Sequence, residues 1–264
     1  MRTPIVTLTT DWGPQGFFAG MVKGALMQMI EGVQVVDIAH AIDPFNVLAA
    51  TFVVKHACLP FPTGTIHIVD VASQHSPEHP FLAIKVRGQY FLCCDNGLPT
   101  MAFGNDIEDL CAIPVQPDGI YNFAAYNLFV PIAARLAAGT PLSDIGPRPT
   151  ALLQRTVPGY LPQGDSYRIY IHYIDPYGNA YLGMTYEEFE KLRGGRHFTM
   201  TVRDQEVTEL MASYHQQHKQ SDPRRRLRLT VSATGALELA IKESSFAQLL
   251  GLRVNDSVLL RFRD

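Results

Sequence analysis

The first half of the chain alternates short apolar segments with longer helical patterns. Residues Ile5–Thr9 are rich in β-branched side chains and predict a strand that is largely buried on both faces. A helical pattern follows over about Gly16–Ile30, and Val33–Ile38 predicts a second strand. Strands that alternate with helices in this way are typical of α/β proteins. We therefore expect an α/β domain with a mostly parallel sheet over residues 1–150.

The pattern continues to about residue 138 with a helix, a strand, a hairpin and a second helix. These elements are expected at about Asn46–Cys58, at Gly64–Val69, at Phe81–Val86 with Gln89–Cys93, and from near Asn127. Gly16, Gly20 and Gly24 recur every fourth residue along the first helix, so they form one stripe. We expect this stripe to pack the helix backbone closely against the sheet.

Residues 146–164 are rich in proline and glycine and are the best candidate for a linker. Beyond them the pattern becomes one of short strands with a single helix near Thr185–Arg193. The expected strands are Tyr167–Ile174, Phe198–Val202, Leu227–Val231, Leu237–Ile241 and Ser257–Phe262. We expect residues 165–264 to form a smaller β-rich domain, a sandwich or a barrel-like fold.

Composition narrows the class of protein. A net charge of −3 and a pI near 6.3 provide no basic footprint for nucleic acid. Neither a signal peptide nor an apolar run long enough to span a bilayer is visible. The four cysteines fit neither a disulfide framework nor a zinc site, so we expect reduced core thiols and a cytoplasmic protein.

Three carboxylates each follow a predicted strand directly: Asp11, Asp70 and Asp95. In an open α/β sheet ligands bind at the carboxyl ends of the strands, so these residues predict a polar site there. Carboxylates that approach one another repel, and such a site favours a polyhydroxyl, cationic or metal-bearing ligand. For Asp11 alone, two interpretations are open: it chelates a pair of hydroxyls, or it caps the helix that follows.

Several segments in this order and spacing resemble the S-adenosylmethionine hydroxide adenosyltransferases, relatives of fluorinase and chlorinase. They include Thr7–Gly13, Val36–His40, Gly64–Asp70, Asp95–Leu98, Tyr177–Asn179 and Gly235–Ala240. No G-x-G-x-x-G follows the first strand and no P-loop motif is present, which makes a dinucleotide or P-loop site a weak alternative. The resemblance implies an α/β domain and a β-barrel-like domain. It also implies a homotrimer in which the β-rich domain completes the nucleoside pocket of a neighbouring subunit.

The resemblance implies roles for matched positions. Asp11 would hold the ribose hydroxyls and Asp70 would lie beside the attacking water. The other implied substrate-binding residues are Phe45, Asn96, Phe123, Asp175, Tyr177 and Asn179. S-adenosylmethionine is the implied substrate, with no separate cofactor and no metal.

The chain also departs from the family pattern. The loop Val71–Pro80 holds no arginine where the family has one, and His79 falls near that place. Ala124 stands where the family has a histidine. We therefore take Asp70 and His79 as the candidate catalytic residues. The sequence leaves three functions open: hydrolysis of S-adenosylmethionine to adenosine and methionine, binding of these molecules without efficient turnover, and metal-dependent hydrolysis.

Overall fold

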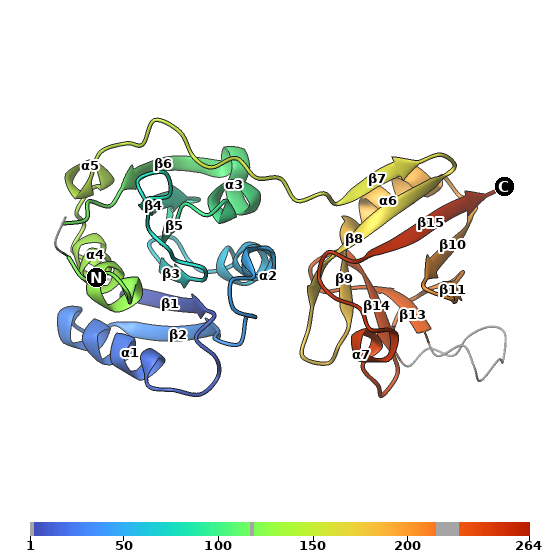
Figure 1. The fold of residues 1–264 in the computed structure, drawn as a ribbon, viewed down its shortest axis with the longest axis horizontal. Coiled ribbons are helices and arrows are strands. Elements are labelled where there is room, and N and C mark those ends of the chain that lie inside the picture. The colour runs from blue at the N-terminus through green and yellow to red at the C-terminus, as the bar shows by residue number, and fades with distance from the viewer. Residues whose placement is uncertain (1–2, 117–118, 215–226) are drawn as a thin grey trace. The chain divides into compact units, whose positions relative to one another are not determined.

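A computed structural model of the chain describes residues 3–116, 119–214 and 227–264 (Figure 1). The chain forms two compact units, residues 1–156 and residues 157–264. Each unit has its own sheet and its own hydrophobic core. The fold is therefore a mixed α/β architecture in two parts, as the pattern of predicted strands and helices indicated.

The first unit is built on a six-stranded sheet with the order β2-β1-β3-β5-β4-β6. The pairs β2-β1, β1-β3 and β3-β5 are parallel, and the pairs β5-β4 and β4-β6 are antiparallel. The strands are β1 (Ile5–Thr10), β2 (Gln34–Ala39), β3 (Ile66–Asp70), β4 (Phe81–Val86), β5 (Gln89–Cys94) and β6 (Ile107–Ala112). The expected strands formed close to their predicted bounds, and β6 was not predicted.

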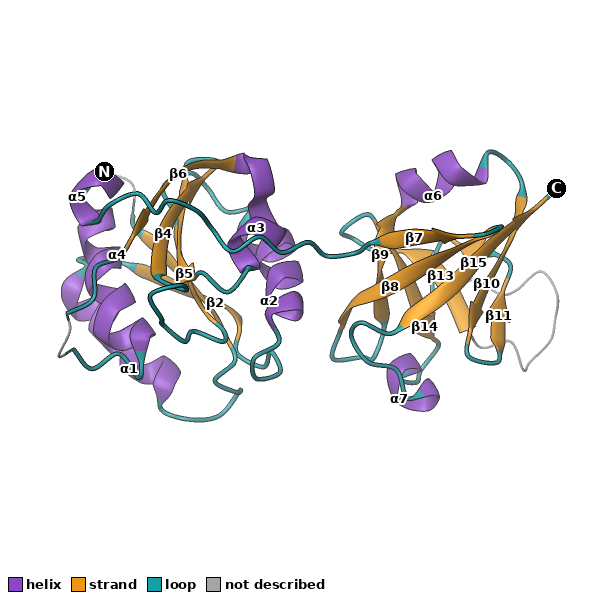
Figure 2. Cartoon of the chain, turned by 45° about the horizontal axis from the view of Figure 1, so that its top comes forward, coloured by secondary structure: helices purple, strands orange, loops and turns teal. Residues whose placement is uncertain are grey.

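Helices cover both faces of this sheet (Figure 2). The α-helices are α1 (Phe18–Met29), α2 (Val47–Val53), α3 (Leu98–Phe103), α4 (Val130–Ala137) and α5 (Leu142–Ile145). Short π-helical segments extend two of them, η1 (Val54–Cys58) after α2 and η3 (Ala125–Phe129) before α4, and η2 (Gly104–Asp106) is a 3₁₀ turn. Helices α1 and α4 pack together on one face, and α2 and α3 pack together on the other.

The order of the parallel strands creates a switch point between β1 and β3. The chain passes from β1 through α1 to β2 on one side of β1, and then through α2 to β3 on the other side. Ligands in open α/β sheets bind at such points, outside the carboxyl ends of the strands. Asp11 follows β1 and Asp70 ends β3, so the topology brings both carboxylates to this position.

The glycine stripe of α1 does not face the sheet, and the prediction of close backbone packing was wrong. The helix buries Val22 and Leu26 instead, while Gly20 and Gly24 are exposed. A Cβ atom built on either glycine would have no neighbour within 4 Å. Small residues at a spacing of four mark one face of a helix, but the larger apolar side chains determine which face is buried.

The hairpin β4–β5 has the turn expected at Arg87 and Gly88. Both residues have positive φ, 50° and 70°, which suits the twist of a two-residue hairpin turn. A Cβ atom on Gly88 would lie 2.7 Å from Thr63 Cγ2, so any other residue there would also displace the Thr63 side chain. The turn thus sets the register in which Phe81 pairs with Cys94 at the other end of the hairpin.

The second unit contains one curled nine-stranded sheet. Its order is β11-β10-β15-β8-β9-β14-β13-β12, with β7 also paired to β8. The strands are β7 (Tyr160–Gln163), β8 (Ser166–Ile174), β9 (Ala180–Thr185), β10 (His197–Val202), β11 (Gln205–Val207), β12 (Leu210–Met211), β13 (Leu227–Val231), β14 (Ala236–Ile241) and β15 (Ser257–Arg263). All pairs are antiparallel except β12-β13. This unit is β-rich, as the short strand patterns predicted.

Two short helices complete the second unit, α6 (Tyr186–Arg193) and α7 (Phe246–Leu250). Thr185 and Glu188 form a capping box at the start of α6, since each side chain bonds the backbone N–H of the other residue. Gly194 ends the helix in the left-handed conformation. These local signals explain why the bounds of α6 agree with the sequence.

The four cysteines, Cys58, Cys93, Cys94 and Cys111, are free and buried, as expected for core thiols. Burial raises their pKa values, to about 11 for Cys58 and Cys111, so they are uncharged near neutral pH. In the described part of the chain, no helix is both long enough and apolar enough to cross a membrane.

Candidate functional site

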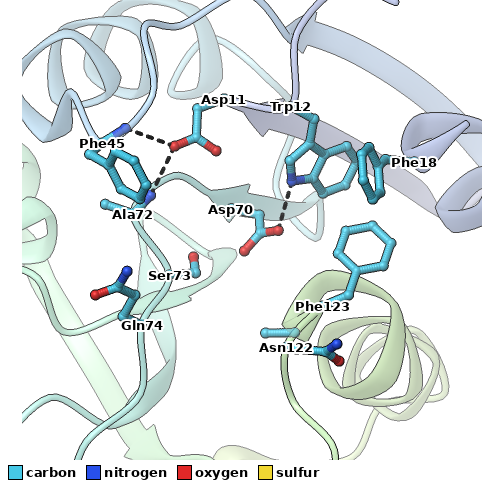
Figure 3. A pocket seen from close by; sticks show the side chains of 11 residues that line it. Asp11, Trp12, Phe18, Phe45, Asp70, Ala72, Ser73, Gln74, Asn122 and Phe123 are labelled. Atoms are coloured by element: carbon cyan, nitrogen blue, oxygen red, sulfur yellow. Dashed lines mark hydrogen bonds between the residues drawn. The ribbon is translucent and has the colours of Figure 1, made fainter. Parts of the chain in front are cut away.

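A pocket of about 240 Å³ lies at the switch point of the first sheet (Figure 3). Its lining comes from the segments that follow β1, β2 and β3 and from the segment that leads into η3. Four of the predicted site residues line it: Asp11, Phe45, Asp70 and Phe123. The fold therefore brings together residues that are far apart in the sequence.

Asp11 ties two loops together at the edge of this pocket. Its Oδ2 accepts hydrogen bonds from Phe45 N at 3.0 Å and from Ala72 N at 3.2 Å (Figure 3). Both donor residues have positive φ, 65° and 49°, a conformation that costs energy for residues other than glycine. Helix α1 begins at Phe18 and has no side-chain cap, so the interpretation of Asp11 as its cap was wrong.

Asp70 is the most deeply placed polar side chain of the pocket. It is 6% exposed, and its Oδ2 accepts a hydrogen bond from the indole Nε1 of Trp12 at 2.9 Å. Burial raises the pKa of Asp70 from its ordinary 3.8 to about 6, the Ser73 hydroxyl and the Trp12 N–H lower it in part, and the Asp11 charge raises it. A carboxylate with this pKa is mostly ionised at pH 7 and accepts protons there.

The loop after Asp70 contributes Ser73 and Gln74 to the lining of the pocket. The Ser73 hydroxyl oxygen is buried on the side of Asp70 (Figure 3) and makes no well-aligned hydrogen bond to any described residue. A buried hydroxyl in this state favours a ligand or a water molecule as its partner. The sequence analysis missed both residues, because nothing in a polar loop distinguishes the two that turn inward.

Aromatic side chains form one wall of the pocket. Trp12 packs edge-on against Phe123, with ring centroids 5.1 Å apart, and Phe18 packs on Phe123 in the same manner at 5.2 Å. Trp12 and Phe18 were also missed as site residues. The position of Trp12, directly after the strand-end Asp11 and as the only tryptophan of the chain, was the signal that pointed to it.

Asn96 and Asp95 support the pocket from outside its lining. The Asn96 amide donates to Val71 O at 2.9 Å and its Oδ1 accepts from Leu98 N, so it anchors the loop that follows Asp70. Asp95 is buried, and both its carboxylate oxygens accept the N–H of Leu153. Of the three carboxylates expected at the strand ends, Asp11 and Asp70 share the pocket and Asp95 is engaged elsewhere.

The residues predicted from the second half of the chain form a turn between β8 and β9. Asp175 accepts hydrogen bonds from the backbone N–H of Asn179 at 2.9 Å and from its amide at 3.1 Å. The ring of Tyr177 is 80% exposed. The turn is thus held by its own side chains and presents an aromatic ring to its surroundings.

His79 does not line the pocket in this structure. Its backbone exchanges hydrogen bonds with Ser76, and its carbonyl oxygen accepts from the Cys94 thiol. The Nδ1 atom is buried without a hydrogen-bond partner among the described residues. The catalytic role of His79 stays a prediction. The other histidine of the loop, His75, packs against Phe81.

The chain was compared with known proteins. Residues 6–146 match the family model of the SAM hydroxide adenosyltransferase N-terminal domain, and residues 169–259 match that of the C-terminal domain. A curated (R)-S-adenosyl-L-methionine hydrolase from Salinispora arenicola is 28% identical over 200 residues, covering 72% of this chain and 76% of the relative. A fluorinase from Actinopolyspora mzabensis is 21% identical over 221 residues, covering 71% and 73%.

Among solved structures, an uncharacterized conserved protein from Thermotoga maritima has the same fold. It aligns with a TM-score of 0.82 at 22% sequence identity and covers 97% of this chain and 99% of its own. The fold defines a two-part α/β protein with a pocket at the switch point of its first sheet. The chain belongs to the SAM hydroxide adenosyltransferase family.

Proposed function

We propose that this protein hydrolyses S-adenosyl-L-methionine to adenosine and L-methionine. The observation that carries the proposal is that Asp11 and Asp70, to which the resemblance of the sequence to this family assigns roles, share one pocket. Curated relatives named (R)-S-adenosyl-L-methionine hydrolase, at 28% identity, support the same reaction. Asp11 would bind the ribose diol, and Phe45 and Phe123 would contact the nucleoside.

The reaction requires no general acid for its leaving group, which is methionine. The oxygen of water attacks C5′ of the ribose, the C5′–S bond breaks, and its electron pair goes to sulfur. The sulfonium thereby leaves as the neutral thioether of methionine, and no proton has to be delivered to it. The water loses one proton, which Asp70 accepts. Placement of the reactants alone contributes on the order of 7–11 kcal/mol in favourable intramolecular reactions.

The lining of the pocket contains no arginine and no histidine among the described residues. Binding without efficient turnover is therefore the second candidate function. The test is incubation of the pure protein with S-adenosylmethionine, with and without a chelator, followed by quantification of adenosine and methionine. Equal release in both arms supports the proposal. Tight adenosine binding with no release supports the binding protein, and release that the chelator abolishes supports a metal-dependent hydrolase.

A metal-dependent reaction has little support from the side chains. No group of three or more histidine, cysteine, aspartate or glutamate side chains in the described part of the chain is arranged to hold a metal ion. Such a site would need Asp95 as a ligand, but both carboxylate oxygens of Asp95 already accept a hydrogen bond from the Leu153 N–H. The proposal assigns the reaction to side chains alone, with no metal and no separate cofactor, and the chelator arm of the incubation tests this.

We also propose that the protein acts as a homotrimer in the cytoplasm, with its site completed by the β8–β9 turn of a neighbouring subunit. The pocket of about 240 Å³ is below the roughly 300–1,000 Å³ of typical ligand sites, which supports a contribution from elsewhere. Sedimentation analysis should give a trimer, and Tyr177→Ala should weaken adenosine binding without changing the mass. A monomer that binds adenosine with full affinity would contradict the proposal.

Substitution of Asp11 should weaken nucleoside binding. Asp11→Ala removes the charged acceptor for two ribose hydroxyls, and a charge-assisted hydrogen bond contributes roughly 1.5–3 kcal/mol. Adenosine affinity measured by calorimetry should fall at least about tenfold. Asp11→Asn is the matched control, because its amide oxygen still accepts from Phe45 N and Ala72 N while the charge is absent. Affinity equal to the parent in both variants would show that Asp11 only holds the two loops.

For His79, the second candidate catalytic residue, we propose that it takes the proton on from Asp70, which requires the loop to bring its ring to the pocket. In that case His79→Ala lowers the single-turnover rate and leaves adenosine affinity unchanged. His75→Ala, in the same loop, is the matched control. If His79→Ala alters affinity and leaves the single-turnover rate as it was, the loop acts as a lid instead.

A further inference from the structure

Trp12 makes the one well-aligned side-chain hydrogen bond to Asp70 among the described residues. The indole Nε1 donates to Oδ2 of the carboxylate at 2.9 Å. The other carboxylate oxygen, Oδ1, points to the side of the buried Ser73 hydroxyl (Figure 3). The two oxygens therefore differ: one is held by a fixed donor, and the other faces a hydroxyl that can rotate and leave it to accept a proton.

The indole itself is held by its neighbours. It stacks on the His40 ring, with centroids 5.9 Å apart and planes 19° apart, and its edge packs against Phe123. A ring enclosed on two sides cannot rotate without displacing these neighbours. Packing thus fixes the position of the indole ring, and with it the direction in which the Trp12 N–H donates to Asp70.

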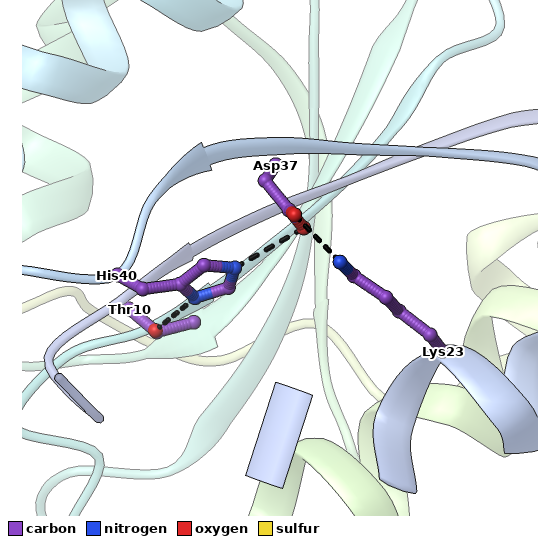
Figure 4. A network of polar contacts seen from close by, with 4 residues as sticks. All are labelled: Thr10, Lys23, Asp37 and His40. Carbon is purple, nitrogen blue, oxygen red and sulfur yellow. Dashed lines mark hydrogen bonds and ion pairs between the residues drawn. The ribbon is translucent and has the colours of Figure 1, made fainter. Parts of the chain in front are cut away.

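A polar network keeps His40 in place behind the indole (Figure 4). His40 Nδ1 lies 2.8 Å from Thr10 Oγ1, and Nε2 lies 3.1 Å from Asp37 Oδ1. Asp37 is paired in turn with Lys23 of α1. None of Thr10, Lys23, Asp37 and His40 lines the pocket, but the ring of His40 stacks on Trp12, which does line it.

We propose that Trp12 is a positioning residue for the hydrolysis, whose indole N–H orients the Asp70 carboxylate so that Oδ1 receives the proton of the attacking water. This inference rests on the proposed function. It assigns to the only tryptophan of the chain a role that an aromatic ring without an N–H does not fill.

Loss of the N–H has two expected consequences. The carboxylate loses its fixed orientation, which lowers the rate of proton transfer and leaves substrate binding in place. The ionised carboxylate also loses a donor that stabilises it, so the pKa of Asp70 rises further. The other titratable groups that face Asp70 are Asp11 and the Cys94 thiol, and Cys94, with a pKa of about 12, stays neutral throughout.

The test uses the fact that the chain has one tryptophan. Growth of a tryptophan auxotroph on 3-benzothienylalanine replaces only Trp12, with sulfur in place of the N–H and the ring shape kept. Trp12→Phe is the second variant. In both variants we expect kcat to fall about tenfold or more, and in the benzothienyl protein, which keeps the ring shape, KM should change by less than about twofold. The acid limb of the kcat profile should move up by about one pH unit. A parent-like kcat and acid limb in the benzothienyl protein would overturn the proposal.

Phe18→Leu is the matched control. Phe18 lines the same wall and packs against Trp12, with centroids 6.3 Å apart, but it has no polar atom. Its substitution should raise KM and leave the acid limb of kcat in place. If Phe18→Leu moves the acid limb as far as Trp12→Phe does, the effect comes from packing and the proposal fails.

A measurement without substrate separates this inference from the proposed function. Fluorescence of the parent comes from one indole, so a titration should show a step near pH 6 that is absent in Asp70→Asn. Absence of the step in the parent overturns the inference even if the protein is active. If the fluorescence step is present but the protein does not hydrolyse S-adenosylmethionine, the proposed function is contradicted and the contact between Trp12 and Asp70 is supported.

Discussion

Asp70→Asn is expected to lower the rate of S-adenosylmethionine hydrolysis about 10²–10⁴-fold, the usual contribution of general acid–base catalysis. Asparagine has nearly the shape of aspartate and still accepts the Trp12 N–H, but it cannot take the proton of the attacking water. Single-turnover rates between pH 5 and 9 measure the effect directly. The parent rate should rise with pH through about 6, following the ionisation of Asp70.

Binding distinguishes this loss of chemistry from a general disruption of the site. Adenosine affinity of Asp70→Asn should stay within about threefold of the parent, because an effect confined to the transition state changes kcat and leaves binding in place. Asp165→Asn, which neutralises an exposed carboxylate in the turn between β7 and β8, is the matched control and should keep parent activity. Full activity of Asp70→Asn would remove the proposed mechanism and leave only a shared fold.

The same substitution is expected to stabilise the protein at neutral and alkaline pH. The pKa of Asp70 is raised by burial to about 6 from an ordinary 3.8, and each pKa unit corresponds to about 1.36 kcal/mol. Its ionisation in the folded protein therefore costs up to about 3 kcal/mol of unfolding free energy. Asp70→Asn should be more stable than the parent by up to this amount at pH 8.

The sign of the effect follows from proton binding in the two states. Below pH 3.8 the carboxyl is protonated in both the folded and the unfolded chain, and Asp70→Asn has no advantage. Between pH 3.8 and 6 the unfolded chain loses the proton first, so the parent loses stability as the pH rises. Above pH 6 the difference is constant.

Urea unfolding of both proteins from pH 4 to pH 8 measures this difference, with Asp165→Asn as the control for a change of net charge. A difference between Asp70→Asn and the parent that does not vary with pH would contradict the assignment of the raised pKa to Asp70. Together, the two predictions describe a carboxylate that carries out catalysis at a cost to stability.

The local pattern of the sequence determined most of the elements. The strand at Ile5–Thr10 is buried on both faces, and its β-branched side chains indicate this directly. The hairpin β4–β5 and the helix α6 formed where predicted, because their turn and cap residues act within a few positions of the chain. The edge strand β6 (Ile107–Ala112) was missed, since its first residues are partly exposed and acidic and interrupt the apolar pattern.

The sequence by itself also determined which carboxylates stand at strand ends, and so predicted Asp11 and Asp70 at one site. Only the tertiary structure decided what each one contacts. Asp95 follows a strand as they do, yet the segment at Leu153, far along the chain, occupies its oxygens. The depth of Asp70, its raised pKa and its contact with Trp12 depend on packing between segments separated by more than fifty residues. Desolvation and hydrogen-bond geometry arise from that packing, and a periodicity in the sequence carries no information about either.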